Sequence, residues 1–399
     1  MTNSRLTKRG KISHKHMSDK NLIVCYFGTY RAEYSRNQIM IEALRCNGVE
    51  VIECQEQLWQ GIGDRVESVE GGWLKFAFWK RVARAYINLL RKYRKTGKYD
   101  VLIVGYPGHF DVLLARFLTW FNRKPLVWDV FMSIYLIALE RGLEEKNRII
   151  VGLIRAWEFI ACRLPDLLII DTSEYAQWFQ KTHQLSANRF KLVPTGADDR
   201  IFRPMIAQPS RENQFKVLYY GTFIPNHGVP YMIEAAKLLS DYKDIQFDFI
   251  GDGPDRTQSI ENVNKHGLKN VTFIEWMDKE SLVKRIAHAH ISLGAFGTTP
   301  QSLMTVQNKI FESLAVGRTV ITGDSPATRQ AFVHRENLYL CERADPDALA
   351  YAILTLYKDP TLQKKIAEMG YATYQQKYSL YKNGERYKSH LLSLIQRHQ

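Results

Sequence analysis

The sequence predicts an α/β fold with two doubly wound domains that face a cleft. Apolar runs suited to strands buried on both faces alternate with helix-length segments along the chain. Several runs end in Gly-containing loops, and in parallel sheets this end of the strands is where ligands bind. The 399 residues suffice for two domains, and 45% hydrophobic with 24% charged residues excludes a disordered or fibrous protein.

The predicted strands divide into two groups, separated by a Pro- and Ser-containing linker at 203–210. A helix is expected at 37–46 in the first group and at 230–239 in the second. The strands are predicted at 22–27, 49–53, 101–106, 126–128 and 167–170 in the first group, and at 216–220, 246–250, 271–274, 291–295 and 319–322 in the second.

These groups predict two Rossmann-like domains, at 21–205 and 206–375. Residues 1–20 form a basic polar tail ahead of them. Residues 359–398 predict two or three helices, and the segment 376–399 is expected to be a C-terminal helix that could cross back to the first domain.

Positive charge is concentrated in two stretches. The chain has 55 Lys and Arg against 41 Asp and Glu, a net charge of +14. Residues 1–20 contribute +5, and residues 73–98, which contain no acid, contribute +9, so the remainder is neutral. A nucleic-acid-binding protein more often spreads its basic residues over a whole domain. We therefore expect a local anionic partner and no nucleic acid.

The cysteines and the apolar runs predict a cytoplasmic protein. The five cysteines include no CxxC pair and leave an odd one, which disfavours a disulfide framework or a zinc site. The first twenty residues lack the apolar segment of a secretory signal. No apolar run is long enough to predict a membrane-spanning helix.

Three motifs in the second domain suit a phosphate-bearing ligand. Gly221 ends a predicted strand and Gly228 opens the next helix, where backbone N–H groups attract phosphate. Gly251 lies in the tight turn Ile-Gly-Asp-Gly-Pro. Lys309 and Glu312 share one helical face. Taken singly, these motifs favour ordinary turns and a surface ion pair, whereas their order within one domain favours a ligand site.

In this order the motifs resemble those of the retaining, nucleotide-sugar-dependent glycosyltransferases of family 4, which have the GT-B fold. The resemblance is clearest over 216–330, with fainter matches at 171–175 and 193–198, and together these cover most of 20–380. It implies an enzyme whose first domain binds the acceptor and whose second domain binds the nucleotide sugar.

The resemblance also implies the donor-binding residues. Glu312 matches the second glutamate of the family's paired-glutamate motif, which holds the donor ribose. Two features depart from the family: Met304 stands in place of the first glutamate, and Thr222 and His227 stand in place of a basic pair on the diphosphate. Lys309 is positioned to replace the lost charge. The implied donor site is Gly221, Thr222, His227, Gly228, Gly251, Trp276 and Met277 beside the nucleobase, Asn308, Lys309 and Glu312.

Stabilising a leaving diphosphate requires positioned donors rather than a nucleophile. Side chains and helix ends can neutralise a diphosphate without a divalent ion, so we expect neither a metal ion nor a cofactor. His109 and Asp129 follow strands of the first domain and are expected at the cleft as catalytic proton acceptors or sugar ligands, although a capping or structural role fits them equally. Gly28 and Thr29 end the first strand and are expected on the acceptor or sugar side.

The basic stretch 73–98 is expected to contact an anionic membrane surface. Its apolar positions 78, 82, 85, 86, 89 and 93 follow helical spacing, and its cations fall mostly on other faces. The alternative is a solvated helix whose apolar face packs on the first domain. The cations expected at the membrane are Lys80, Arg81, Arg84, Arg91, Lys92 and Lys95.

These observations predict a glycosyltransferase that moves a sugar, with retention, to a membrane-associated lipid-linked or envelope-glycan acceptor, working peripherally on the inner face of the membrane. One alternative is a nucleotide-sugar epimerase or hydrolase of the same fold. Another is a non-catalytic basic protein that binds membranes or nucleic acid.

Overall fold

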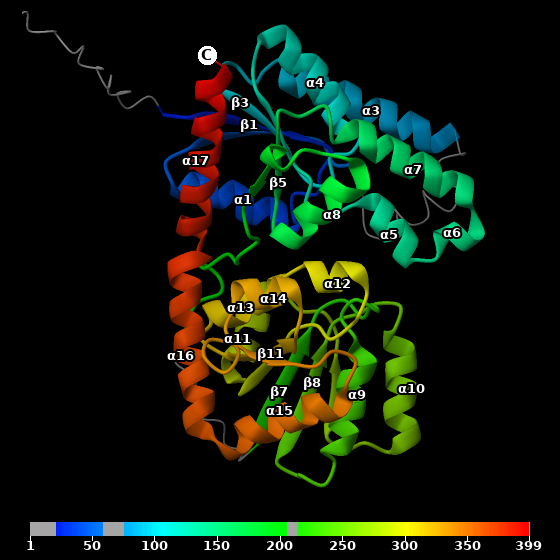
Figure 1. Ribbon diagram of the computed structural model, residues 1–399, viewed down its shortest axis with the longest axis vertical. Helices are drawn as coiled ribbons and strands as arrows, with labels where there is room; N and C mark the ends of the chain where they lie inside the picture. The colour runs from blue at the N-terminus through cyan, green and yellow to red at the C-terminus, as the bar shows by residue number, and fades with distance from the viewer. Residues whose placement is uncertain (1–20, 59–75, 206–213, 399) are drawn as a thin grey trace, which may run out of the picture.

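The computed structural model describes residues 21–58, 76–205 and 214–398, and these form two α/β domains stacked along the long axis of the molecule (Figure 1). All strand pairs within the two sheets are parallel. The first sheet has the order β2-β1-β3-β4-β5-β6, and the second has the order β12-β11-β10-β7-β8-β9. The predicted fold class is confirmed. The tail 1–20 and most of the predicted linker lie outside the described residues.

In the first domain the inner strands are apolar on both faces, because helices cover both sides of the sheet. All four residues of β3 and of β5 are buried. The elements are β1 (Ile23–Gly28), α1 (Ser35–Cys46), β2 (Glu50–Gln55), α3 (Phe76–Tyr93), β3 (Val101–Val104), α4 (Asp111–Asn122), β4 (Leu126–Asp129), α5 (Ile134–Glu140), α6 (Leu143–Lys146), α7 (Arg148–Ala161), β5 (Leu167–Ile170), α8 (Ser173–His183), a 3₁₀ turn η2 (Ala187–Arg189) and β6 (Phe190–Leu192).

The second domain repeats the alternation, and two apolar clusters pack on the two faces of its sheet. Its elements are β7 (Phe215–Tyr220), α9 (Val229–Leu238), β8 (Ile245–Ile250), α10 (Arg256–His266), β9 (Val271–Ile274), α11 (Lys279–His288), β10 (Ile291–Leu293), α12 (Pro300–Met304), α13 (Asn308–Ala315), β11 (Thr319–Gly323), α14 (Pro326–Ala331), β12 (Tyr339–Cys341), α15 (Pro346–Lys358) and α16 (Pro360–Lys377); α17 (Leu380–His398) follows.

The basic helix α3 turns its apolar face inward. Ala85 and Leu89 are buried, and Tyr86 and Tyr93 pack against the core between the sheet and its helices. The exposed cations are Lys80, Arg84, Arg91 and Lys92 on α3 and Lys95 after it, with Lys92 paired to Glu56 at 2.7 Å, while Arg81 is half-buried. The alternative prediction, a helix whose apolar face packs on the first domain, therefore describes this helix. The side chains of 73–79, including position 78 of the predicted apolar face, lie outside the described part.

The chain crosses between the domains twice, and the two crossings touch. Val193 packs in the first domain and Ala197 in the second, whereas Tyr378 packs in the second and Leu380 in the first. Gly196 has φ +68°, and a Cβ there would lie 2.5 Å from the carbonyl oxygen of Tyr378. This close approach requires a glycine between the two crossings.

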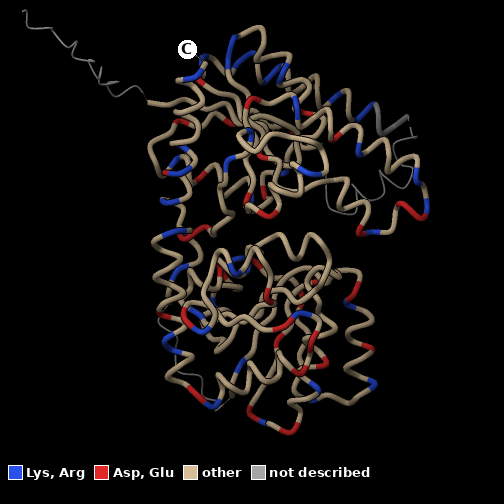
Figure 2. Tube along the Cα trace, viewed as in Figure 1, with Lys and Arg blue, Asp and Glu red and all other residues tan. Residues whose placement is uncertain are grey.

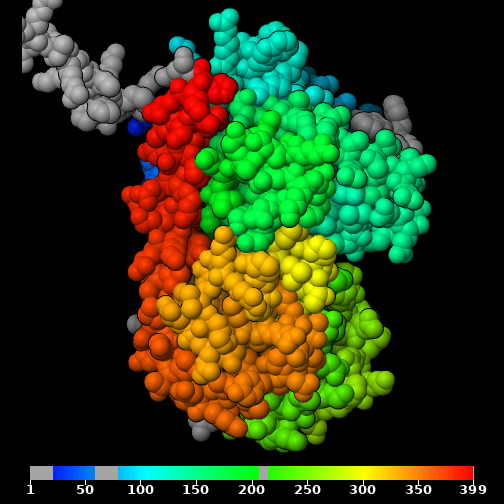
Figure 3. Space-filling model, viewed as in Figure 1, coloured from blue at the N-terminus to red at the C-terminus, as the bar shows by residue number. Residues whose placement is uncertain are grey.

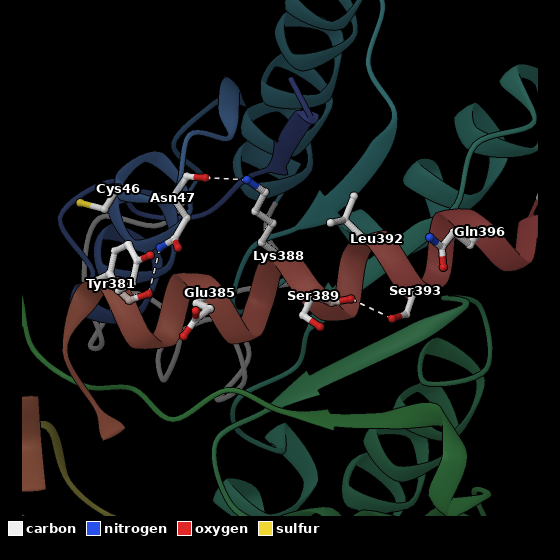
Figure 4. A pocket seen from close by; sticks show the side chains of 9 residues that line it. All are labelled: Cys46, Asn47, Tyr381, Glu385, Lys388, Ser389, Leu392, Ser393 and Gln396. Carbon is white, nitrogen blue, oxygen red and sulfur yellow. Dashed lines mark hydrogen bonds between the residues drawn. The ribbon is translucent and has the colours of Figure 1, made fainter. Parts of the chain in front are cut away.

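Helix α17 returns along the first domain and packs on α1 (Figure 1). Asn47 donates its side-chain N–H to the carbonyl oxygen of Tyr381 at 2.9 Å, and Lys388 donates to the carbonyl oxygen of Asn47 at 2.8 Å. The two helices border an open groove of about 510 Å³, in which the exposed Cys46 lies (Figure 4). The C-terminal helix thus covers the face of the first sheet opposite α3 and α4.

Among the helices in the described ranges, none combines the length and the apolar character needed to span a bilayer.

Candidate functional site

The loop after β7 and the start of α13 bring Lys309, His227 and Gly221 together. The Lys309 side chain is buried, with the residue 6% exposed. Its ammonium nitrogen lies 4.2 Å from the ring centre of Tyr219 and 3.4 Å from Nδ1 of His227. A Cβ at Gly221 would lie 2.7 Å from the same nitrogen. The structure therefore places two other predicted donor-site residues, Gly221 and His227, beside the Lys309 cation.

Glycine is required where the strand-end loops of this domain touch. Gly251 has φ +131°, and a Cβ there would lie 2.2 Å from the carbonyl oxygen of Gly221. Gly228 has φ +68° at the N-cap of α9, and its Cβ would lie 2.6 Å from the backbone nitrogen of Gly297. The N-terminus of α9, which carries partial positive charge, therefore lies against the loop that contains Gly297. His227 directly precedes this N-terminus.

His227 is neutral in this arrangement. Its Nδ1 lies 2.6 Å from the carbonyl oxygen of Thr222, which also accepts the hydroxyl of Tyr219 at 2.9 Å. Because a carbonyl oxygen can only accept, Nδ1 carries the proton and Nε2 remains an acceptor. Burial, followed by the charge of Lys309, lowers the pKa of His227 well below its ordinary value. The positive charge at this point therefore belongs to Lys309.

The pKa values of Lys309 and Glu312 are both shifted. Burial lowers the pKa of Lys309 to about 7, against the opposing effect of the Glu312 carboxylate. Burial also raises the pKa of Glu312 to about 7, although the Tyr220 hydroxyl and two lysines favour its ionised form. A bound anion would restore the charge of Lys309, and ligand hydroxyls would donate to Glu312. The pair is therefore suited to a ligand carrying both phosphate and hydroxyl groups.

Lys279 is a site residue that was not predicted from the sequence. It begins α11, whose N-cap Asp278 accepts the backbone N–H of Ser281 at 2.8 Å. Its ammonium donates to the side-chain oxygen of Gln38 in the first domain at 2.7 Å, and its charge acts on the Glu312 carboxyl. Its place directly after the Trp276-Met277-Asp278 segment is the sequence signal that could have identified it.

The remaining donor-site predictions are less enclosed. Trp276 follows β9 and is 53% exposed, whereas Met277 is half-buried against the core of the second domain. Asn308 is half-buried as the first residue of α13. Their contact with a nucleobase stays a prediction.

Met304, the residue at the position of the family's first glutamate, lies at the domain junction. Its carbonyl oxygen accepts the Thr172 hydroxyl at 2.5 Å. Its side chain packs on the apolar cluster of the first domain. An apolar residue at this position therefore has a packing role between the domains.

Gly28 and Thr29 are held by a buried carboxylate. The backbone N–H of Thr29 donates to Oδ2 of Asp111 at 2.7 Å, and its hydroxyl donates to the same carboxylate at 3.0 Å. Tyr86 adds a hydrogen bond at 2.8 Å. Gly28 has φ +140°, and a Cβ there would lie 2.7 Å from Oδ2 of Asp111. Thr29 is 3% exposed, so its hydroxyl is used within the domain and only the loop backbone is left for a ligand.

His109 belongs to a buried network rather than to an open cleft. The residue is 4% exposed, and its Nε2 lies 3.1 Å from Glu158 of α7. Glu158 also accepts from His183 at 2.9 Å and from the Ser133 hydroxyl at 2.6 Å. These hydrogen bonds outweigh its burial and lower the pKa of Glu158 to about 2. The histidine joins the loop after β3 to α7 through Glu158, which suits the structural alternative, and a catalytic role for His109 stays a prediction.

Asp129 likewise has a structural environment. It is fully buried and forms a two-pronged ion pair with Arg36, at 2.9 Å to Nε and 3.1 Å to Nη2. Arg36 also donates to the carbonyl oxygen of Val193 at 2.8 Å. Since both carboxylate oxygens are taken, Asp129 holds α1 and the crossing segment against the sheet. This environment suits the structural alternative, and a role as a proton acceptor stays a prediction.

The domains meet around the site through polar contacts. Glu140 at the end of α5 accepts the backbone N–H of Gln301 at 2.7 Å and the side chain of Asn226 at 3.1 Å. Near the crossings, a cavity of about 260 Å³ lies between the ends of β5 and β6 and helices α13 and α14. Asp171 lines it, and burial raises the pKa of Asp171 to about 7. The second domain therefore presents its loops directly to the first.

Within the described ranges, no group of three or more His, Cys, Asp or Glu side chains could hold a metal ion.

Comparisons with known proteins define the class of this protein. Residues 214–359 match the family model described as "Glycosyl transferases group 1". The chain is 28% identical over 294 residues to the alpha-D-kanosaminyltransferase of Streptomyces kanamyceticus, covering 71% of this chain and 73% of that protein. The matched segment contains the donor-site predictions of the second domain. The protein is therefore a glycosyltransferase that uses a nucleotide-sugar donor.

Solved structures show the fold over almost the whole chain. The fold is similar to that of sucrose-phosphate synthase from Thermosynechococcus elongatus, with a TM-score of 0.71 and 15% identity, covering 94% of this chain and 100% of that one. It is also similar to Anabaena HepE in complex with UDP, with a TM-score of 0.68 and 14% identity over the same shares. The two domains therefore form the GT-B fold.

Proposed function

We propose that the protein transfers a sugar from a uridine diphosphate sugar, with retention of anomeric configuration, to a lipid-linked or envelope-glycan acceptor at a membrane surface. The observation that carries the proposal is the buried Lys309, which faces Gly221 and neutral His227 beside the N-terminus of α9. The uridine base is supported by the likeness to HepE bound to UDP. Retention is supported by the resemblance to the retaining family.

The site supplies what departure of a diphosphate requires. As the bond between the anomeric carbon and the phosphate oxygen breaks, negative charge accumulates on the diphosphate, and Lys309 is the nearest buried cation. The loop at Gly221 and the N-terminus of α9 add backbone N–H donors. Glu312 and Lys279 would hold the nucleoside. With retention, the acceptor hydroxyl attacks from the face that the diphosphate leaves, so a phosphate oxygen is the nearest acceptor for its proton.

A membrane-borne acceptor is supported by the charge of the first domain. Lys80, Arg84 and Arg91 are exposed on α3, and Lys95 is exposed directly after it. Exposed cations close to an anionic bilayer contribute about 1 kcal/mol each. Since the excess charge lies on the first domain and not around Lys309, it suits the surroundings of the acceptor.

The test combines donor identification with transfer. A thermal-shift screen of nucleoside diphosphates and nucleotide sugars should show the largest stabilisation with uridine compounds. The stabilising donor is then incubated with and without a membrane lipid extract, and the linkage of the product is determined by NMR. We expect transfer only with the extract and an unchanged anomer. Free sugar or an epimer formed without acceptor would instead show a hydrolase or an epimerase, and no stabilisation by any nucleotide would contradict the assigned donor site.

A further inference from the structure

The outer surfaces of α4 and α7 expose large apolar side chains. Trp120 and Phe121 are 74% and 70% exposed at the end of α4. Contiguous exposed apolar patches on folded domains commonly mark sites of interaction. We call this surface the α4–α7 apolar face; its residues are Phe110, Leu113, Phe117, Trp120 and Phe121 at α4, and Ile149, Leu153, Phe159 and Ile160 on α7.

Contacts between the helices make these side chains one surface. Phe110 stacks on Trp157 of α7 with 5.5 Å between ring centres, and Arg116 of α4 donates to the carbonyl oxygen of Leu164 at 2.7 Å. On the other side, Asn122 of α4 donates to the hydroxyl of Tyr93 in α3 at 2.9 Å. Helices α3, α4 and α7 lie side by side over one face of the first sheet (Figure 1). The α4 segment projects at the end of the molecule that is farther from the second domain (Figure 3).

The apolar face is bordered by positive charge. The acidic residues within α4 and α7 are Asp111 and Glu158, and both are buried. Described residues of α3 contain no acid. Blue Lys and Arg positions follow these helices in Figure 2. The exposed cations around the face are Arg84 and Arg91 on α3, Arg123 after α4, and Arg148 and Arg155 on α7.

We propose that the α4–α7 apolar face inserts into the interfacial region of a bilayer rich in anionic lipid, while the surrounding cations contact the headgroups. The inference rests on the membrane association proposed above and assigns insertion to α4 and α7, because the apolar face of α3 is used within the domain. Aromatic side chains surrounded by basic residues are typical of surfaces that lie in the membrane interface.

The charge pattern argues against the other occupants of such a face. A second copy of the chain, docked through a two-fold axis, would bring the same arginine-rich borders together. A nucleic acid would pair with the arginines but would leave Leu113, Ile149 and Leu153 without an apolar partner. An anionic bilayer satisfies both the apolar centre and the basic border.

Insertion would place the cleft beside the membrane. Helix α7 packs on α5 and α6, and Glu140 at the end of α5 contacts the second domain at Gln301 and Asn226. The inserted surface is therefore joined to one wall of the cleft through α5. An acceptor with its lipid chain in the bilayer would have a short path to that wall.

The experiment measures binding of the full chain to vesicles of phosphatidylcholine with and without phosphatidylglycerol. The wild type should float with the anionic vesicles and bind them at least about tenfold more tightly than the double variant Trp120→Ser with Phe121→Ser. The control Tyr351→Ser removes an aromatic side chain that is 69% exposed on the second domain and should bind as the wild type does. Thermal unfolding and UDP binding of each variant, measured in solution, verify that it is folded.

A second measurement reports insertion directly. Brominated lipid should quench tryptophan fluorescence of the wild type, and the conservative Trp120→Phe variant should lose much of that quenching while still binding. Equal vesicle binding by the Trp120/Phe121 variant and the wild type would overturn the assignment of the face. Failure of the wild type to bind either vesicle would overturn membrane association, while UDP binding and transfer to an extracted acceptor would still test the proposed chemistry separately. A concentration-dependent dimer that the double variant loses would identify the face as a self-association surface instead.

Discussion

The ammonium nitrogen of Lys309 lies 3.4 Å from Nδ1 of His227, with Lys309 buried in α13 and His227 half-buried in the loop after β7. Since Nδ1 of His227 donates to the Thr222 carbonyl oxygen, the two groups do not share a proton. The site therefore keeps one cation in a low-dielectric position, where its attraction to an anion is strong.

Replacing this cation should impair the enzyme at the chemical step. We expect Lys309→Met to lower kcat/KM for the nucleotide sugar by about 100-fold, as loss of a group that stabilises developing charge commonly does. Steady-state kinetics with the donor found by thermal shift measure the effect. Lys284→Ala on the exposed face of α11 is the matched control and should behave as the wild type. Equal kinetics of Lys309→Met and wild type would place the diphosphate elsewhere.

Glu312 should contribute to binding of the nucleoside. Its carboxylate lies on the same helical face as Lys309, and hydrogen bonds from hydroxyl groups to a charged acceptor are stronger than neutral ones. We expect Glu312→Gln to weaken UDP binding by about tenfold and Glu312→Ala by more, as measured by calorimetry. Unchanged affinity in both variants would mean that the ribose lies elsewhere.

Donor binding should be strongest near neutral pH. The pKa of Lys309 is lowered to about 7, so above that pH it must take up a proton to bind a diphosphate, and affinity should fall by up to about tenfold per pH unit. The pKa of Glu312 is raised to about 7, so below that pH it must lose a proton to accept hydroxyl groups. A calorimetric pH series should give a maximum at about pH 7. Lys309→Met should remove the alkaline fall and Glu312→Gln the acidic one; a profile that neither variant changes would show that other groups control binding.

The ion pair between Arg36 and Asp129 should control stability. Removing one partner of a fully buried pair leaves an uncompensated charge, and we expect Asp129→Asn to cost about 3 to 5 kcal/mol in the free energy of unfolding. The double variant Arg36→Met with Asp129→Leu should lose less. Denaturant unfolding measures both. If Asp129→Asn abolished transfer without a change in stability, the result would instead support the predicted catalytic role of Asp129.

Glu140 should act through closure of the domains. It accepts hydrogen bonds from Gln301 and Asn226 across the cleft, and neither contact involves Lys309. We expect Glu140→Ala to leave UDP affinity within about twofold of the wild type while kcat falls by about tenfold, because the reacting groups are less often brought together. Small-angle X-ray scattering should show a larger radius of gyration for the variant than for the wild type. A parallel loss of UDP affinity would show that Glu140 binds the donor itself.

Two kinds of feature could be predicted from the sequence: strands that are delimited by turns, and glycines at strand ends. The strands at 167–170 and 271–274 were predicted with the observed bounds, because their flanking turns delimit them. The strands β6 and β12 were missed; three residues do not provide a periodic pattern, and the equally short β10 was predicted two residues too long. The glycines at 221 and 251 were predicted because a strand-end glycine reports close backbone approach.

Residues whose roles depend on distant partners could not be assigned in the same way. The predicted strand ends placed His109 and Asp129 at the correct edge of the sheet. Their hydrogen-bonding partners, Glu158 and Arg36, lie on helices and are 49 and 93 residues away in the chain. Lys279 and Glu140 were missed because their partners lie in the other domain. A local sequence pattern does not indicate which residues of the two domains contact each other.

The contact of Gly196 with Tyr378 has a mechanical consequence. Both connections between the domains pass through one small region, so we expect the domains to move relative to each other mainly by rotation about it. Every donor that enters and every nucleotide that leaves would use the same rotation. A side chain at position 196 would collide with the carbonyl oxygen of Tyr378 and so hinder this rotation.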